Sequence, residues 1–102
     1  MIFLAKNTKT DFENNNKIFI GQKRSMDYVL AAMFVLNESK AVKLLARGRT
    51  ISHAVDVGEI LKNNFIKGAT YGEILITTEE LPNKDGTMSN VSSIEIEILP
   101  PK

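Results

Sequence analysis

The chain has no cysteine and a single histidine among its 102 residues. Disulfides and thiolate metal sites are therefore excluded, and cysteine usage gives no sign of secretion. It also lacks any run of about 18 apolar residues that could span a membrane. The apolar residues 1–5 are too few for the core of a signal peptide. We expect a soluble protein with no membrane partner.

Excess charge of either sign is also absent overall, because the net charge is only +1. Residues 17–49, however, contain seven Lys and Arg against two Asp and Glu, a net charge of +5. Residues 50–102 contain four against eight, a net charge of −4, and residues 1–16 balance. A polyanionic partner would therefore contact the first of these regions.

Hydropathy patterns predict one domain with the element order β-α-β-α-β-β. The expected strands are residues 17–21, 40–47, 73–80 and 92–99, and the expected helices are residues 26–37 and 51–65. Ser25 is expected to cap the first helix, and Gly68 to end the second. Asp85-Gly86 predicts a hairpin turn. The fold class is α/β, as a two-layer α+β domain with a mixed four-stranded sheet, because strand–helix–strand implies a parallel pair.

Two segments need a separate interpretation. Residues 7–16 are polar and aperiodic, so residues 1–16 are expected to form a mobile arm before a domain at 17–102. The first helix is apolar almost all round, so more than one of its sides must be covered. The sheet covers one side, and the second helix or another subunit must cover the other.

The most informative stretch is residues 46–52, where Arg47 and Arg49 flank a glycine between a strand and a helix. Guanidinium groups match phosphate oxygens, and a helix N-terminus adds free N–H groups. Residues 22–24 (Gln-Lys-Arg) form the other strand-to-helix junction. Adjacent parallel strands end at one edge, so we expect the two basic loops side by side, as binding to a polyanion requires. Alternatively, both arginines are solvated or paired with carboxylates.

No catalytic constellation is visible. His53 has Asp56 and Glu59 nearby, but two ligands without a third do not make a metal site, so a structural or exposed histidine is expected. Neither basic loop has an aromatic residue, which argues against base stacking and for contacts to phosphates. We expect no enzyme activity, no cofactor, no metal and no small-molecule substrate.

Four segments resemble the Alba family of archaeal chromatin proteins: IGQK at 20–23, MDYVLAA at 26–32, LARGRTISHAVD at 45–56 and VSSIEI at 91–96. The likeness covers about residues 17–99. It implies the fold of the C-terminal domain of translation initiation factor three. It further implies a cytoplasmic, chromosome-associated homodimer that coats double-stranded DNA and also binds RNA.

The resemblance implies roles for single residues. Arg47 and Arg49 match the family's paired arginines, and Lys23 matches a lysine that follows the first strand's glycine. Gln22 replaces a second lysine, whose acetylation in the family is associated with weaker DNA binding. Phe65 matches an aromatic residue that the family uses between neighbouring dimers. The expected nucleic-acid-binding residues are Gln22, Lys23, Arg24, Lys43, Arg47, Arg49, Lys84 and Asn90.

The last hairpin departs from the family pattern, since Thr87 and Asn90 stand where basic residues are common. With Gln22, these departures predict weaker binding and a shallower dependence on salt than a fully basic relative would show. Two alternatives stay open. One is an RNA-dedicated ribonucleoprotein subunit or regulator, and the other is a scaffolding domain whose basic edge binds an acidic protein.

Overall fold

The computed structural model describes residues 16–102, so the expected arm lies outside the described residues except for Asn16. The elements are β1 (Lys17–Phe19), α2 (Ser25–Asn37), β2 (Val42–Arg47), α3 (Ile51–Ile60), β3 (Thr70–Pro82) and β4 (Met88–Leu99). A short 3-10 turn, η1 (Gly48–Thr50), precedes α3, and a π-helical turn, η2 (Leu61–Phe65), continues it. The predicted order of strands and helices is confirmed.

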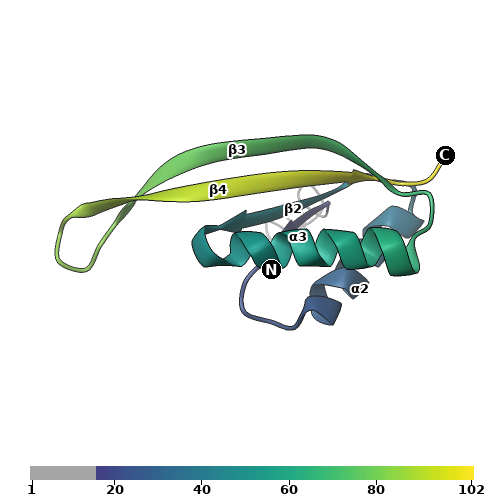
Figure 1. Cartoon of the computed structure of the whole chain (residues 1–102), viewed down its shortest axis with the longest axis horizontal. Helices are drawn as coiled ribbons and strands as arrows, with labels where there is room; N and C mark the ends of the chain where they lie inside the picture. The colour runs from purple at the N-terminus through teal and green to yellow at the C-terminus, as the bar shows by residue number, and fades with distance from the viewer. Residues whose placement is uncertain (1–15) are drawn as a thin grey trace, which may run out of the picture.

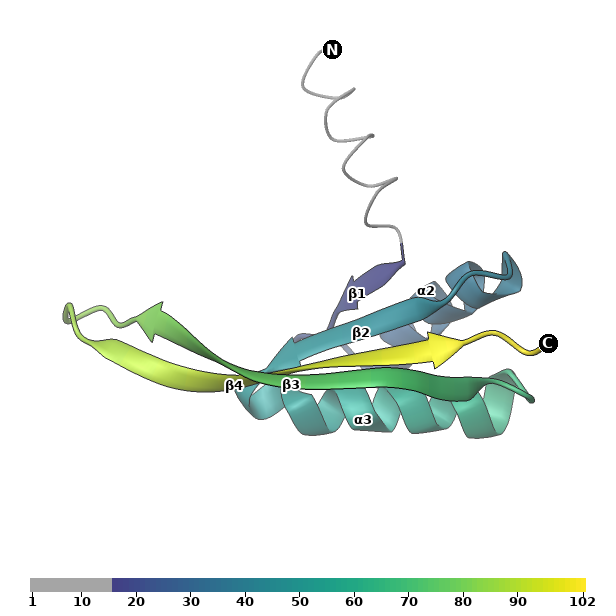
Figure 2. The ribbon, with the colours of Figure 1, turned by 90° about the horizontal axis from the view of Figure 1, so that it is seen from above.

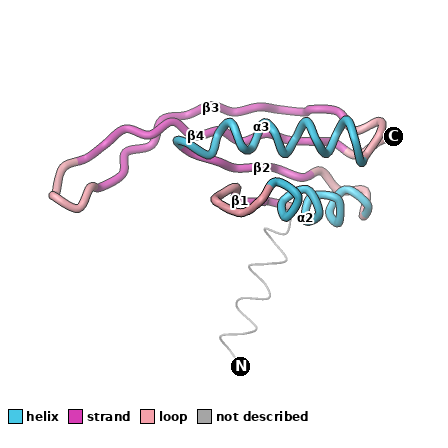
Figure 3. The backbone as a smooth tube through the Cα atoms, turned by 60° about the horizontal axis from the view of Figure 1, so that its bottom comes forward, coloured by secondary structure: helices cyan, strands magenta, loops and turns pink. Residues whose placement is uncertain are grey.

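The four strands form one mixed sheet in the order β1-β2-β4-β3. β1 pairs with β2 in parallel, and the other two pairings are antiparallel. Both helices cover the same face: α2 contacts β1 and β2, whereas α3 contacts β2 and β4 (Figures 2 and 3). The hairpin of β3 and β4 extends past the body of the domain (Figure 1). Within residues 16–102, no helix is long and apolar enough to cross a membrane.

The core lies between the helices and this covered face of the sheet. Side chains alternate along a strand, so every second residue of β2 and β4 points toward the helices. Leu44 pairs with Ile96 and Val42 with Ile98, and all four side chains are buried. They pack with Val29 of α2 and other buried helix residues. The other face of the sheet, which we call the open face, carries no helix from the described part of the chain (Figure 2).

The prediction that Ser25 caps the first helix is wrong. α2 begins at Ser25 itself, and the N-cap position is held by Arg24, whose side chain makes no capping hydrogen bond. The Ser25 hydroxyl instead bonds to the ring of His53, 3.0 Å away. A long-range partner has thus replaced the local one that Ser usually finds at a helix start.

The hairpin is longer than the hydrophobic alternation predicted. The ladder between β3 and β4 continues outward to the pair Pro82 and Met88, beyond the predicted limits at residues 80 and 92. The predicted turn is present, since Gly86 has φ +93° and Asp85 accepts hydrogen bonds from the backbone and hydroxyl of Thr87. β1, by contrast, ends at Phe19, because the chain turns away from β2 after Ile20.

Apolar side chains remain uncovered in the single chain. Leu30 and Phe34 on α2 are 56% and 68% exposed, so only the sheet and part of α3 cover that helix. Ile74 and Ile76 point to the helical side of the sheet, yet they are 48% and 73% exposed because β3 is an edge strand. Over residues 16–102, the second helix therefore provides the expected second cover of α2 only in part.

One polar contact ties the end of α3 to β3. The Tyr71 hydroxyl donates to Glu59 at 2.5 Å, and the Asn63 amide donates to the same carboxylate at 3.3 Å. These bonds lower the pKa of Glu59, with Tyr71 as the larger cause. Burial and the bond to Glu59 raise the pKa of Tyr71.

The Tyr71→Phe variant should be less stable than the original chain above about pH 4.5 and should lose this difference in acid. The folded state favours the charged Glu59, whose ordinary value is 4.5, so its contribution disappears as the pH falls through the lowered folded pKa. Thermal unfolding of both proteins between about pH 3 and 7 measures this. A stability difference that stays constant across that range would show that the Tyr71–Glu59 bond is not responsible.

Candidate nucleic-acid interface

Two basic segments lie side by side at the C-terminal ends of the two parallel strands, as the sequence predicted. The first, called the β1–α2 loop, is residues 20–24, and the second, called the β2–α3 turn, is residues 47–50. β1 and β2 are neighbours in parallel, and the Ile20 N–H donates to the carbonyl of Leu45 at 2.8 Å. Each segment leads directly into the N-terminus of a helix. The free N–H groups and positive end of each helix therefore face the same edge.

His53 fastens the β1–α2 loop to the first turn of α3. Its Nδ1 lies 3.1 Å from the carbonyl oxygen of Gly21, and its Nε2 lies 3.0 Å from the hydroxyl of Ser25. A carbonyl can only accept, so Nδ1 carries the proton and a neutral ring accepts from Ser25 at Nε2. Within residues 16–102, no group of three His, Asp or Glu residues could hold a metal ion. His53 thus links the β1–α2 loop to the first turn of α3, a contact that was not evident from the sequence.

Tyr28 of α2 holds the backbone of the same loop through hydrogen bonds. Its hydroxyl accepts hydrogen bonds from the backbone N–H groups of Gly21 at 2.8 Å and Lys23 at 3.0 Å. Its ring meets the ring of His53 edge to face, with centroids 5.5 Å apart. The buried tyrosine thus fixes the loop backbone, while the side chains of Gln22, Lys23 and Arg24 remain exposed.

The β2–α3 turn is held by a side chain of its own. The Thr50 hydroxyl donates to the carbonyl of Arg47 at 2.9 Å and accepts from its N–H at 3.3 Å. Gly48 has φ +61°, a conformation that L side chains rarely adopt. The glycine between the two arginines therefore permits the tight turn that brings both of them to the surface.

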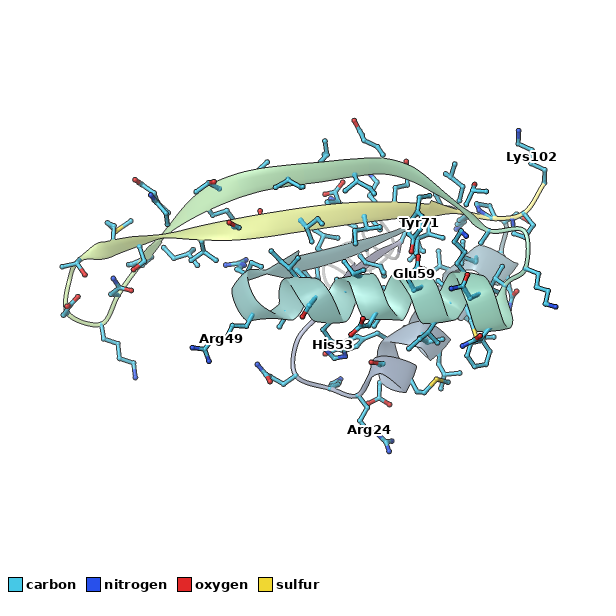
Figure 4. The ribbon with its side chains drawn as sticks, in the orientation of Figure 1. Arg24, Arg49, His53, Glu59, Tyr71 and Lys102 are labelled. Carbon is cyan, nitrogen blue, oxygen red and sulfur yellow. The ribbon has the colours of Figure 1, made fainter. Side chains whose placement is uncertain are left out.

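The arginines keep most of their capacity to bind an anion. Arg47 makes one ion pair with Glu79, at 3.8 Å, and its side chain is 54% exposed. Exposed pairs of this length stabilise little, and a guanidinium has five donors. The interpretation of Arg47 as a residue paired with a carboxylate thus holds only in part. Arg49 and Arg24 project on the same side of the molecule, with His53 between them (Figure 4).

Three predicted residues lie elsewhere. Lys43 is the second residue of β2, lies on the open face and pairs with Glu95 at 3.5 Å. Lys84 belongs to the turn at the hairpin tip, and Asn90 lies on β4 opposite Glu80. Five of the predicted residues, Gln22, Lys23, Arg24, Arg47 and Arg49, belong to the two neighbouring segments, and the surface that these segments form is here called the loop surface. The Arg47 side chain lies at its border with the open face, where it pairs with Glu79 of β3. The other three lie outside it.

Comparison with known proteins shows to which family the chain belongs. Residues 16–78 match the Alba family model. The DNA/RNA-binding protein Alba of Methanocella arvoryzae is 46% identical over 89 residues, which cover 86% of this chain and 93% of that protein. The DNA/RNA-binding protein Alba of Thermoplasma volcanium is 50% identical over 82 residues, covering 79% of this chain and 91% of its own.

Solved structures show the same fold. The structure titled Alba from Thermoplasma volcanium superposes with a TM-score of 0.78 at 48% identity, covering 82% of this chain and 99% of that one. ALBA1 from Trypanosoma brucei, at 21% identity, superposes with a TM-score of 0.70 over 86% of this chain and 71% of its own. The latter likeness concerns the fold alone. With a family match over more than half its length and such relatives, this chain belongs to the Alba family.

Proposed function

We propose that this protein is a homodimeric chromatin protein that coats double-stranded DNA, chiefly through phosphate contacts, and that also binds RNA. The observation that carries the proposal is the loop surface, in which His53 ties the β1–α2 loop to the first turn of α3, directly after the β2–α3 turn. Two permanent cations, Arg47 and Arg49, belong to the segment next to the one that carries Lys23 and Arg24, and each segment leads into a helix N-terminus. A row of cations is what a phosphate backbone requires. The names of the relatives, DNA/RNA-binding protein Alba, support the same class of partner.

A second copy of the chain would complete the surface. Ile74 and Ile76 form an apolar strip on the edge strand, and Val55 of α3 is 42% exposed. α3 runs antiparallel to β3 (Figure 2), and Glu59 of α3 contacts Tyr71 of β3. Val55 lies one helical turn before Glu59, so it is on the same face of α3, toward the part of β3 that carries Ile74. Covering such a strip favours association, and a twofold dimer would present two loop surfaces. Phe65, 41% exposed at the end of η2, is available for contacts between neighbouring dimers.

Binding should be weaker than in a fully basic relative. Gln22 is exposed but neutral, and the Thr87 hydroxyl is occupied by Asp85 and Asn83 within the hairpin turn. Asp85 also places a negative charge next to Lys84. Fewer cations meet phosphates, and each missing cation lowers the affinity and its salt dependence.

The Gln22→Lys variant should bind duplex DNA more tightly and with a steeper salt dependence. Each added phosphate contact steepens the slope of log K against log salt by about 0.9, or by about 1.8 if both subunits of a dimer gain one contact. Fluorescence anisotropy with a labelled duplex at several salt concentrations measures both quantities. An unchanged slope would mean that position 22 does not meet a phosphate.

A direct test of the proposed function is a titration of the purified protein against duplex DNA and structured RNA between about 50 and 300 mM salt, with sedimentation to give the mass. A dimer whose affinity for duplex DNA falls steeply with salt is expected. Clear preference for RNA in direct competition would favour the RNA-dedicated alternative. Failure to bind either polymer at low salt would favour the acidic-protein partner instead. The proposed chromosomal location follows from binding to DNA.

A further inference from the structure

The open face of the sheet presents an aromatic ring beside the loop surface. Phe19, the last residue of β1, is 67% exposed and pairs across the ladder with Leu45 of β2. Arg47 follows two residues after Leu45, so both side chains point to the same face. An exposed phenyl ring thus lies on the open face at the end of β1, where the β1–α2 loop begins and close to Arg47 at the end of β2. The absence of aromatic residues from both loops had argued against stacking, but the strand supplies a ring.

A cavity of about 350 Å³ opens on this face. Phe19, Leu45 and Leu75 give it apolar walls, and Arg47 lies at its border. The hydroxyl groups of Thr77 and Ser93, 2.7 Å apart, line it as well. The cavity is therefore continuous with the loop surface, and it combines a flat ring, apolar walls and hydrogen-bonding groups.

The charges around the cavity favour a ligand with a neutral group inside the cavity and an anionic group outside it. Its two carboxylates, Glu79 and Glu95, each hold a cation, at 3.8 Å from Arg47 and at 3.5 Å from Lys43. An isolated phosphate inside the cavity would be repelled by the two acids. A base is uncharged and can enter, while its phosphate remains outside on the arginine side.

From this geometry we infer that the cavity takes one unpaired base of a single-stranded nucleic acid, stacked on Phe19, with the adjoining phosphate on Arg47. The inference rests on the proposed function and adds to it a site for single strands, because a base within a duplex would first have to be unpaired and unstacked, which costs a few kcal/mol. Stacking on aromatic side chains is a general means of holding single strands.

The carboxylates give this site a preference. Glu and Asp accept hydrogen bonds from the exocyclic amino group of cytosine, whereas uracil presents a carbonyl at the equivalent position. With Glu79 and Glu95 in the walls, cytosine should bind more tightly than uracil, although the two rings have the same size. Oligo-C and oligo-U RNA of about 12 nucleotides are therefore a matched pair of probes.

Two substitutions at position 19 test the site in the full chain. Phe19→Trp keeps a stacking ring and introduces the only tryptophan, since the sequence has none. Phe19→Leu keeps an apolar side chain but removes the ring. Phe34, on α2 and exposed to the same degree, provides the matched controls Phe34→Trp and Phe34→Leu.

We expect oligo-C to quench the fluorescence of the Phe19→Trp variant, and a duplex of about 12 base pairs to leave it unchanged. Phe19→Leu should weaken oligo-C binding by about fivefold or more and change duplex binding by less than about twofold. The Phe34 variants should show neither effect. Wild-type protein should bind oligo-C more tightly than oligo-U.

Several results would overturn the site. One is unquenched fluorescence of the Phe19→Trp variant at saturating oligo-C. Another is an equal loss of single-strand and duplex binding in the Phe19→Leu variant. A third is a lower sedimenting mass of the Phe19→Leu variant, which would assign the open face to contacts with a second copy of the chain. These outcomes leave duplex binding by wild-type protein intact. If wild-type protein binds no nucleic acid at all, the proposed function fails first, and the base site fails with it.

Discussion

Replacing Arg47 and Arg49 together with alanine should reduce the affinity for duplex DNA more than any other pair of substitutions in the chain. Both side chains are exposed at the β2–α3 turn, next to the N-terminus of α3. The slope of log K against log salt should fall by about 0.9 for each phosphate that is no longer neutralised, or by about 3.6 if each subunit of a dimer releases two phosphates. Anisotropy titrations at several salt concentrations measure this slope.

A control with the same change in charge is available at the other end of the molecule. Lys102 lies far from Arg49 (Figure 4), and Lys67 lies just before β3, whose first residue pairs with the end of β4. The Lys67→Ala, Lys102→Ala variant loses two positive charges per chain but none from the loop surface. If both double variants lose affinity and slope equally, binding depends on net charge, and the loop surface is not the phosphate site.

The second large effect is expected from His53→Ala. Loss of the ring removes the bonds to Gly21 and Ser25, and also the edge-to-face contact with Tyr28. Leaving a partly buried carbonyl without its donor costs roughly 1–3 kcal/mol of unfolding free energy. The β1–α2 loop should then lose its fixed position relative to the β2–α3 turn, and the affinity for duplex DNA should fall.

The salt dependence separates this effect from that of the arginines. His53→Ala removes no permanent cation, so the affinity should fall at every salt concentration with a nearly unchanged slope. Ser52→Ala, at an exposed position of α3, is the neighbouring control and should leave both affinity and stability unchanged. A His53→Ala protein with full affinity would show that the two loops need not be linked. A fall in slope like that of the arginine variant would mean that His53 contacts phosphate itself.

The fold could be predicted from the sequence because apolar residues repeat with different periods in its helices and in its strands. Ile94, Ile96 and Ile98 alternate along β4, and the resulting strand faces the core as predicted. The adjacency of the two basic loops followed from a general rule on parallel strands, and the structure confirms it. These inferences rested on local periodicity and on connection rules, both of which a single sequence contains.

The hydrogen bonds that set the loop geometry could not be predicted in this way. His53 lies 32 residues from Gly21 and 28 from Ser25 in the sequence, and no local pattern indicates such a bond. Ser25 matched the usual start of a helix, but its hydroxyl serves the histidine. Tyr28 looked like one more apolar residue of α2, and only the folded chain shows that its hydroxyl holds the loop backbone.

The ring of Phe19 was missed for a different reason. The sequence indicates that the residue belongs to a strand, but not which face of the sheet is left open. That depends on the placement of both helices on the other face (Figure 3). Only then does an apolar strand residue become an exposed ring beside Arg47.

The β1–α2 loop and the β2–α3 turn are expected to act as one surface on a phosphate backbone. Amide chemical shifts of labelled protein, followed while a short DNA duplex is added, test it residue by residue. Residues 21–24 and 47–50 should shift together, with the same apparent affinity and before residues at the Lys102 end of the sheet. Shifts confined to one of the two segments, or absent from both while the duplex binds, would show that the two segments do not form one phosphate-binding surface.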